Sequence, residues 1–303
     1  MNKLLIICGP TATGKTALAL QIARAYHAQC IAADSRHVYQ GLDILTGKDL
    51  PHDATKIWAT NLVTPHEPYS VAQYQQTARA IISAVHKRGA MAILVGGTGL
   101  YIRAVVGRVD TARVPQNSAL RTTLSSYSIA QLQAKLRCAD GCKWQYMNRS
   151  DRMNPPRLIR AIEVASWKST HPMVSDQAPG YDALWIGLSG PLEVLKKNIK
   201  QRVLARFAHG VVGEVKSFDA SESGTTHQAS TSLGLSVIRR CIAGQLHKDE
   251  VVGLWTQEEY AYVKRQLTWF RKVPDIHWFD ITKKNYHTDI GTLVREWYTR
   301  ETI

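Results

Sequence analysis

The residues with the clearest chemistry lie at the start of the chain, where residues 9–16 read Gly-Pro-Thr-Ala-Thr-Gly-Lys-Thr. This stretch fits G-x-x-x-x-G-K-[ST], the pattern of loops that cradle phosphates. Glycines let backbone N–H groups turn toward oxyanions, and the N-terminus of a following helix adds partial positive charge. Lys15 can reach an outer phosphate, and the Thr16 hydroxyl can ligate Mg²⁺. The pattern predicts a polyphosphate site and does not identify the polyphosphate as ATP.

The elements around this loop are those that a phosphate-binding loop requires. Residues 17–23 form a helical pattern directly after the loop, and Ser70 and Gln73 form a capping box before a second helix. Buried strands are predicted at 4–8, 29–33, 91–95 and 184–188. This alternation predicts an α/β fold, with a parallel sheet flanked by helices as in P-loop nucleotide-binding proteins.

Two further polar residues follow predicted strands. Ligands bind at the carboxyl ends of parallel strands, so we expect Asp34 and Thr98 to share one cleft with the loop. Asp34 could orient a nucleophile and accept its proton, although it could also cap a helix or stabilise a loop. The third predicted strand ends in Gly96-Gly97-Thr98 rather than in an acidic residue, which disfavours a plain ATPase.

The middle of the chain interrupts this alternation. Residues 110–153 have no strand pattern and are rich in Gln, Ser, Arg and Ala. We therefore predict a small helical insertion domain at 110–165, within a catalytic core formed by 1–109 and 166–303. A long helical pattern at 192–215 is interrupted at Gly210.

A basic helix near the C-terminal end is a second candidate site. A capping box from Thr256 to Glu259 predicts its start, and Lys264 and Arg265 precede Trp269. Basic residues beside an aromatic ring suit a phosphate backbone and an unstacked base. The alternative is a solvated cationic face with Trp269 half-buried in the core, and the helix alone favours this alternative.

Composition sets limits on the partners and the compartment. The 303 residues carry a net charge of +14, which suits a polyanion partner, although basic enzymes with small substrates exist. The five cysteines are irregularly spaced and indicate free thiols in a reducing compartment. No apolar run is long enough for a membrane span, and the chain begins with a strand. We expect a cytoplasmic protein that does not bind a membrane.

Six blocks of the sequence occur together in an order that is typical of one family. The blocks are 9–19, 34–35 with 38–44, 69–74, 94–101, 154–164 and 264–271. In these blocks the chain resembles the tRNA dimethylallyltransferases, also called tRNA isopentenyltransferases or the IPP transferase family. The resemblance extends over nearly the whole chain, and a kinase would share only its first block.

The resemblance implies a prenyl transfer. A dimethylallyl group would move from dimethylallyl diphosphate to the exocyclic amine of the adenosine 3′ to the tRNA anticodon, and diphosphate would leave. The resemblance implies that Asp34 is the general base, that Thr11 and Arg202 act on the diphosphate, and that Mg²⁺ binds at Thr16. The implied diphosphate-binding residues are Gly9, Thr11, Ala12, Thr13, Gly14, Lys15, Thr16 and Arg202.

The resemblance also implies contacts with the anticodon stem-loop of tRNA. The insertion domain at 110–165 would clamp the stem, and a monomer is expected. The implied tRNA-binding residues are Asp34, Ser35, Arg36, His37, Thr98, Pro156, Arg157, Leu158, Ile159, Arg160, Lys264, Arg265, Gln266, Trp269 and Arg271.

Three stretches depart from the family pattern. Arg36-His37 replaces Ala-Leu, residues 231–236 lack the tyrosine and basic residue of Gly-Tyr-[Arg/Lys], and Leu45-Thr46-Gly47-Lys48 stands for Gly-Thr-Ala-Lys. The diphosphate site is therefore better supported than the tRNA site. The alternatives are an isopentenyltransferase acting on free adenylate, a P-loop small-molecule kinase, and an RNA-binding relative that has lost catalysis.

Overall fold

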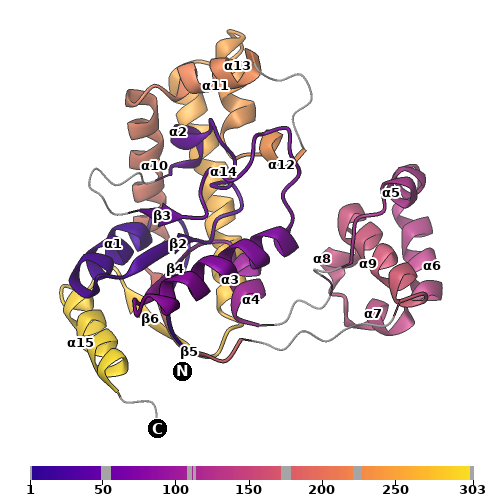
Figure 1. The fold of residues 1–303 in the computed structure, drawn as a ribbon. Helices are drawn as coiled ribbons and strands as arrows, with labels where there is room; N and C mark the ends of the chain where they lie inside the picture. The colour runs from indigo at the N-terminus through magenta and orange to yellow at the C-terminus, as the bar shows by residue number, and fades with distance from the viewer. Residues whose placement is uncertain are drawn as a thin grey trace. The chain divides into compact units, whose positions relative to one another are not determined.

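The computed structural model describes residues 2–48, 56–107, 111, 114–171, 179–220 and 227–300. These residues form two compact units (Figure 1). The first unit combines Met1–Gly107 with Pro179–Ile303, and the second is Arg108–Ala178. The insertion domain predicted at 110–165 falls inside the second unit.

The first unit is built on one six-stranded parallel sheet with the order β3-β2-β4-β1-β5-β6. The predicted α/β class and parallel sheet are therefore confirmed. The four predicted strands are present, whereas the two edge strands, β3 and β6, were not predicted. The strands are β1 (Asn2–Cys8), β2 (Gln29–Ala32), β3 (Ile57–Trp58), β4 (Ala92–Gly96), β5 (Tyr181–Ser189) and β6 (Ile276–Asp280).

Helices cover both faces of this sheet. Successive residues of a strand point to opposite faces, and in the central strands the residues on both faces are apolar. Leu4 and Ile6 pack with α3, α4, α10 and α14, whereas Leu5 and Ile7 pack with α1 and α15 (Figure 1). The helices of this unit are α1 (Lys15–Tyr26), α2 (Asp43–Thr46), α3 (Val71–Lys87), α4 (Gly99–Val106), α10 (Leu192–Ala208), α11 (Val211–Ala220), α12 (His227–Ser230), α13 (Leu235–Ile242), α14 (Lys248–Phe270) and α15 (Tyr286–Thr299).

Helix α14 is longer than the sequence predicted. It begins at Lys248, where the Glu250 carboxylate accepts a hydrogen bond of 2.8 Å from the His247 N–H group. The predicted start at Thr256 is wrong, because the Thr256 hydroxyl donates to the Val252 carbonyl, at 2.6 Å, inside the helix. A threonine that bonds four residues back is compatible with the helix interior, so the capping pattern was coincidental.

The second unit is entirely helical in its described residues. Each helix starts after a side chain that caps its first turn, and Leu124, Leu132, Leu136 and Leu158 form its core. The boundary predicted at 165 lies inside its last helix. The helices are α5 (Ser118–Ser125), α6 (Ile129–Ala139), α7 (Gly141–Tyr146), α8 (Arg149–Arg152) and α9 (Pro155–Lys168).

The cysteines and the helices agree with two further expectations from the sequence. All five cysteines are free thiols, and Cys8 and Cys30 are buried in the sheet. Within the described ranges, every helix is too short or too polar to cross a bilayer.

Candidate active site

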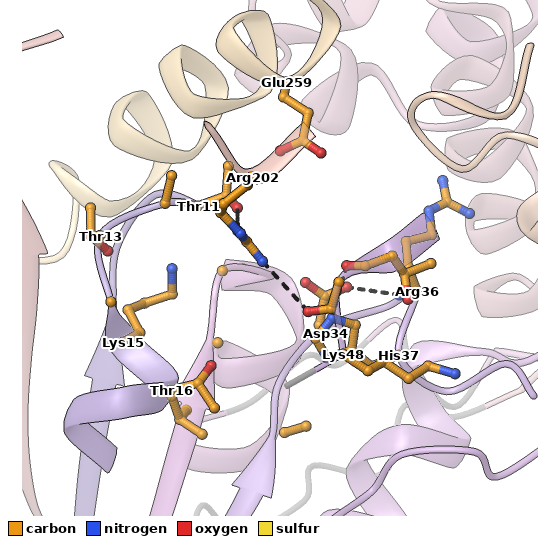
Figure 2. A pocket seen from close by; sticks show the side chains of 18 of the residues that line it. Thr11, Thr13, Lys15, Thr16, Asp34, Arg36, His37, Lys48, Arg202 and Glu259 are labelled. Atoms are coloured by element: carbon orange, nitrogen blue, oxygen red, sulfur yellow. Dashed lines mark hydrogen bonds between the residues drawn. The ribbon is translucent and has the colours of Figure 1, made fainter. Parts of the chain in front are cut away.

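A cleft of about 1280 Å³ lies in the first unit, at the carboxyl ends of the parallel strands. The loop after β1, the loop after β2 and helices α10 and α14 supply its walls (Figure 2). It therefore brings together segments from both ends of the chain. The predicted site residues that line it are Thr11, Ala12, Thr13, Gly14, Lys15, Thr16, Asp34, Ser35, Arg36, His37, Arg202, Arg265 and Gln266.

The phosphate-binding loop has the backbone that its glycines predict. Gly9 has a φ of +128°, and a Cβ atom there would lie 2.2 Å from the Leu188 carbonyl oxygen, so only glycine fits against β5. Gly14 has a φ of +82°, and α1 begins at Lys15, which places the helix N-terminus at the cleft. Such a loop before a helix is an anion-binding geometry.

Helices α10 and α14 brace this loop from outside. The Gln266 side chain accepts from the Thr11 N–H group at 2.9 Å and donates to the Gly97 carbonyl at 3.0 Å. Asn198 donates to the Ala12 carbonyl at 3.2 Å. Gln266 is buried, and both ends of its amide are engaged with backbone. A contact between Gln266 and tRNA stays a prediction, and it would compete with these two bonds.

Arg202 joins the loop to the opposite wall of the cleft. Its Nη1 donates to the Thr11 hydroxyl at 2.7 Å, and its Nη2 lies 3.5 Å from the Gly47 carbonyl oxygen (Figure 2). The Lys15 ammonium is 2.5 Å from the Pro10 carbonyl oxygen at the other side of the same loop. Two basic side chains and a helix N-terminus thus face one cavity, which favours a ligand with several negative charges.

Asp34 lies across the cleft from the loop (Figure 2). Its Oδ1 accepts from the Arg36 N–H group at 2.8 Å, so the carboxylate stabilises its own turn. In the described part of the chain, no hydrogen bond reaches its Oδ2. Both roles weighed for Asp34 are therefore compatible, because one oxygen stabilises the loop and the other is available to a ligand.

Thr98 supports this turn from the end of β4. Its hydroxyl accepts from the Ser35 N–H group at 3.1 Å, and Tyr262 of α14 lines the same cleft as this turn. Burial raises the pKa of Tyr262 to about 12, so the phenol remains protonated beside the cleft that it lines. Tyr262 was missed by sequence reasoning, although it precedes Gln266 by one helical turn and so shares its face of α14.

Three buried charged residues in the cleft wall were also missed. Arg206 forms an ion pair with Glu259, and both are almost fully buried. Lys48 donates to Asp43 at 2.6 Å and to the Asn61 side chain at 2.5 Å, and burial lowers its pKa. The i, i+4 spacing of Asn198, Arg202 and Arg206 on α10 was the signal that could have identified Arg206.

All three departures from the family pattern meet at the cleft. The Arg36 guanidinium donates to the Thr231 hydroxyl at 3.1 Å. His37 Nε2 lies 3.3 Å from the Thr46 carbonyl oxygen, in the third departing stretch. Thr231, Ser232 and Leu233 line the cleft beside Arg36. The unusual residues therefore form one connected surface rather than isolated changes.

The predicted RNA-binding residues of α14 lie on different faces. Lys264 and Arg265 are exposed and stand over tyrosine rings, and Arg271 is exposed just after the helix. Trp269 is half-buried, and its ring comes within 2.1 Å of where a Cβ atom of Gly99 would be. The packing of Trp269 therefore agrees with the alternative prediction, in which this side chain is half-buried in the core.

The predicted RNA-binding residues of α9 are also mixed. Pro156 and Arg157 are exposed, Ile159 is partly buried, and Leu158 is fully buried in the core of the second unit. Arg160 donates to the carbonyls of Thr111 and Val114, at 2.7 and 2.8 Å, and also bonds Glu163. Leu158 and Arg160 are therefore engaged in folding this unit.

Comparison with known proteins shows which family this chain resembles. Residues 37–273 match the family model described as IPP transferase. The chain is 36% identical over 287 residues to tRNA dimethylallyltransferase 2 of Shewanella sediminis, covering 91% of this chain and 92% of the relative. It is 35% identical over 302 residues to tRNA dimethylallyltransferase of Nostoc punctiforme, covering 98% and 97%.

Solved structures agree with this assignment. The tRNA isopentenylpyrophosphate transferase of Bacillus halodurans superposes with a TM-score of 0.70 at 28% identity, covering 98% of each chain. A eukaryotic dimethylallyltransferase acting on tRNA superposes with a TM-score of 0.81 at 19% identity, covering 100% of this chain and 81% of that one, and supports the fold alone. The chain therefore belongs to the IPP transferase family, together with the tRNA dimethylallyltransferases.

Proposed function

We propose that this protein is a tRNA prenyltransferase. It transfers a dimethylallyl group from dimethylallyl diphosphate to the exocyclic amine of the adenosine 3′ to the anticodon and releases diphosphate. The observation that carries this proposal is the contact of Arg202 with Thr11 in a phosphate-binding loop that faces Asp34 across one cleft. Relatives with this activity in their names cover nearly the whole chain.

The residues of the cleft suit this reaction. Cleavage of the carbon–oxygen bond builds negative charge on the diphosphate and positive character on the allylic carbon. Lys15, Arg202 and the N–H groups of the loop are positioned to stabilise the growing anion. Asp34 would hold the attacking amine and take its proton. An exocyclic amine is a poor nucleophile, so its orientation and desolvation contribute more than the basicity of Asp34.

A divalent metal fits the residues of the loop, and we propose Mg²⁺ at Thr16. Mg²⁺ keeps several waters and commonly binds through one or two protein oxygens together with substrate phosphates. Thr16 supplies one hydroxyl at the N-terminus of α1, facing the cleft. The described residues contain no cluster of three or more His, Cys, Asp or Glu, which suits a metal held mainly by diphosphate oxygens. The bound metal would supply electrostatic stabilisation of the leaving group.

The tRNA surface is proposed from cationic side chains on both units. Arg36 and Arg265 stand at the cleft, and Lys264 is exposed nearby on α14. On the second unit, Arg157 is exposed at the start of α9 and would contact the anticodon stem. We propose that the protein acts as a monomer, as the resemblance implied.

The decisive experiment incubates the protein and Mg²⁺ with labelled dimethylallyl diphosphate and, in parallel, bulk tRNA, AMP or ATP. We expect label in tRNA and none in AMP. Label in AMP alone would favour the adenylate isopentenyltransferase, and ATP consumption without prenyl transfer would favour the kinase. Pyrophosphate binding without label in any acceptor would favour the relative that has lost catalysis.

A further inference from the structure

Gly47 is the residue against which both arginines of α10 are packed. A Cβ atom at Gly47 would lie 2.5 Å from Arg206 Nη2 and 2.8 Å from Arg202 Nη2. Both distances are shorter than those that real Cβ atoms make. Gly47 also has a φ of +66°, in the left-handed region, and follows α2 as its C-cap. The two guanidinium groups therefore occupy the space that any other residue would fill.

The backbone at Gly47 is held in place on both sides. The Glu214 carboxylate accepts from the N–H groups of Ile44 and Leu45, at 2.8 and 2.7 Å. On the other side, the Lys48 ammonium bonds Asp43 and the Asn61 side chain. The segment cannot move away from the arginines without losing these bonds, several of which involve charged groups.

Arg206 is held as firmly as the backbone. It is paired with buried Glu259, and its guanidinium carbon lies 5.0 Å from the centre of the Trp255 ring. Displacing it would leave a carboxylate buried without its partner, which is strongly unfavourable. Arg202 is held less firmly, by one short hydrogen bond to Thr11 and a long one to the Gly47 carbonyl. A Cβ atom at position 47 would overlap both guanidinium groups, and the less firmly held one, Arg202, should therefore move further than Arg206.

We propose that Gly47 is a positioning residue that sets the place of the Arg202 guanidinium for diphosphate binding. This inference rests on the proposed function of the cleft. Gly47 stands where the family pattern has alanine, and Leu45, where that pattern has glycine, is buried. The arrangement is thus a property of this chain, in which the exchanged residues and the two arginines fit one another.

The test measures calorimetric binding of inorganic pyrophosphate with Mg²⁺ to the full chain. Gly47→Ala should weaken pyrophosphate binding by about tenfold, because the charge-assisted bond from Arg202 is misplaced. Gly41→Ala is the matched control, because Gly41 also has a positive φ, +72°, but a Cβ atom there meets nothing within 4 Å. The control should bind pyrophosphate like the wild type, within about twofold.

A second pair of variants separates backbone strain from overlap. Asparagine tolerates the left-handed region, so Gly47→Asn keeps the overlapping Cβ with less strain, and Gly41→Asn is its control. We expect Gly47→Asn to weaken pyrophosphate binding as well, with melting temperatures similar to those of the controls. Equal affinities for the Gly47 and Gly41 variants would overturn the inference while leaving tRNA prenylation by the wild type intact. A wild type that neither binds pyrophosphate nor labels tRNA would overturn both proposals.

Discussion

Asp34 stabilises its own loop, and in the proposed reaction it would also serve as the base. Its Oδ1 holds the Arg36 N–H group, and its position across the cleft from the phosphate-binding loop allows Oδ2 to meet a substrate. Thr98 then fixes this turn from the end of β4. In the proposed reaction, an Asp34 side chain oriented in this way would lose little entropy when it engages the amine.

At this scale we predict that Asp34→Asn separates the two roles. The amide oxygen still accepts from the Arg36 N–H group, but it cannot take a proton, so kcat should fall by about 10²- to 10⁴-fold. Pyrophosphate affinity, measured by calorimetry, should remain unchanged because the phosphate-binding loop is intact. Asp34→Ala should be equally inactive and should also raise hydrogen exchange at the Arg36 amide. More than a tenth of wild-type kcat in Asp34→Asn would exclude Asp34 as the base.

At the scale of elements, α14 combines three functions on three faces. Val263 and Phe270 are buried in the core, Tyr262 and Gln266 face the cleft, and Lys264 is exposed. A helix of 23 residues has enough turns to carry all three. The exposed face is therefore available for a phosphate backbone without weakening the core.

Arg265 should act as a phosphate contact on this helix. Arg265→Ala is expected to weaken tRNA binding and to reduce the slope of log K against log salt by about one. The measurement is a filter-binding titration at several salt concentrations. Arg295→Ala, an exposed arginine on α15, is the matched control and should leave the slope unchanged. An unchanged slope in Arg265→Ala would mean that this face is only solvated.

In the second unit, α9 is anchored to α5 through a buried carboxylate. Glu163 accepts from Arg121 at 2.7 Å and from the Asn117 N–H group at 2.9 Å, and its side chain is 1% exposed. Burial alone would raise the pKa of Glu163, but the hydrogen bonds from Arg121, Asn117 and Arg160 lower it below its ordinary value of 4.5. The carboxylate is therefore more acidic in the folded unit than in the unfolded chain.

This shift predicts an acid-sensitive unit. The unfolded state binds more protons than the folded state, so the stabilisation is fully present above pH 4.5 and is lost as pH falls through the folded-state pKa. Glu163→Gln should remove this pH dependence and lower the free energy of unfolding at pH 7 by about 2 kcal/mol. Hydrogen exchange of α5 and α9 across this pH range measures both effects. Glu193→Gln, at an exposed glutamate of α10, should leave this exchange unchanged.

At the scale of the whole molecule, the cleft and the second unit have no residues in common. All of the residues that line the cleft belong to the first unit. The net charge of +14 is spread over the whole chain and suits a long polyanion better than a mononucleotide. Diphosphate binding and tRNA binding should therefore respond to different substitutions.

Arg157 tests this division. Its side chain is 61% exposed on α9, and it pairs with Asp151. Arg157→Ala should raise the KM for tRNA several-fold, as expected for the loss of one phosphate contact, and leave pyrophosphate affinity unchanged. Lys168→Ala, at the far end of the same helix, is the control and should change neither value. Equal effects on tRNA from both variants would show that α9 contributes only general charge.

The sequence by itself determined the features that depend on neighbouring residues. The loop at residues 9–16, the four predicted strands and the position of Asp34 after a strand follow from local patterns and strand order. The family resemblance then predicted that Arg202 acts on the diphosphate. Strand β6 escaped prediction because it lies at a sheet edge with His277 and Trp278 exposed, so its burial pattern is weak.

Only the tertiary structure decided which side chains support the site and which are free to contact a substrate. Gln266 braces Thr11 across 255 positions of sequence, Arg206 pairs with Glu259, and Gly47 receives two guanidinium groups from another helix. Leu158 and Trp269 match RNA-binding motifs yet are packed against neighbours. The physical reason is that hydrogen bonding and burial depend on contacts between distant segments, which a residue type and its local spacing do not specify.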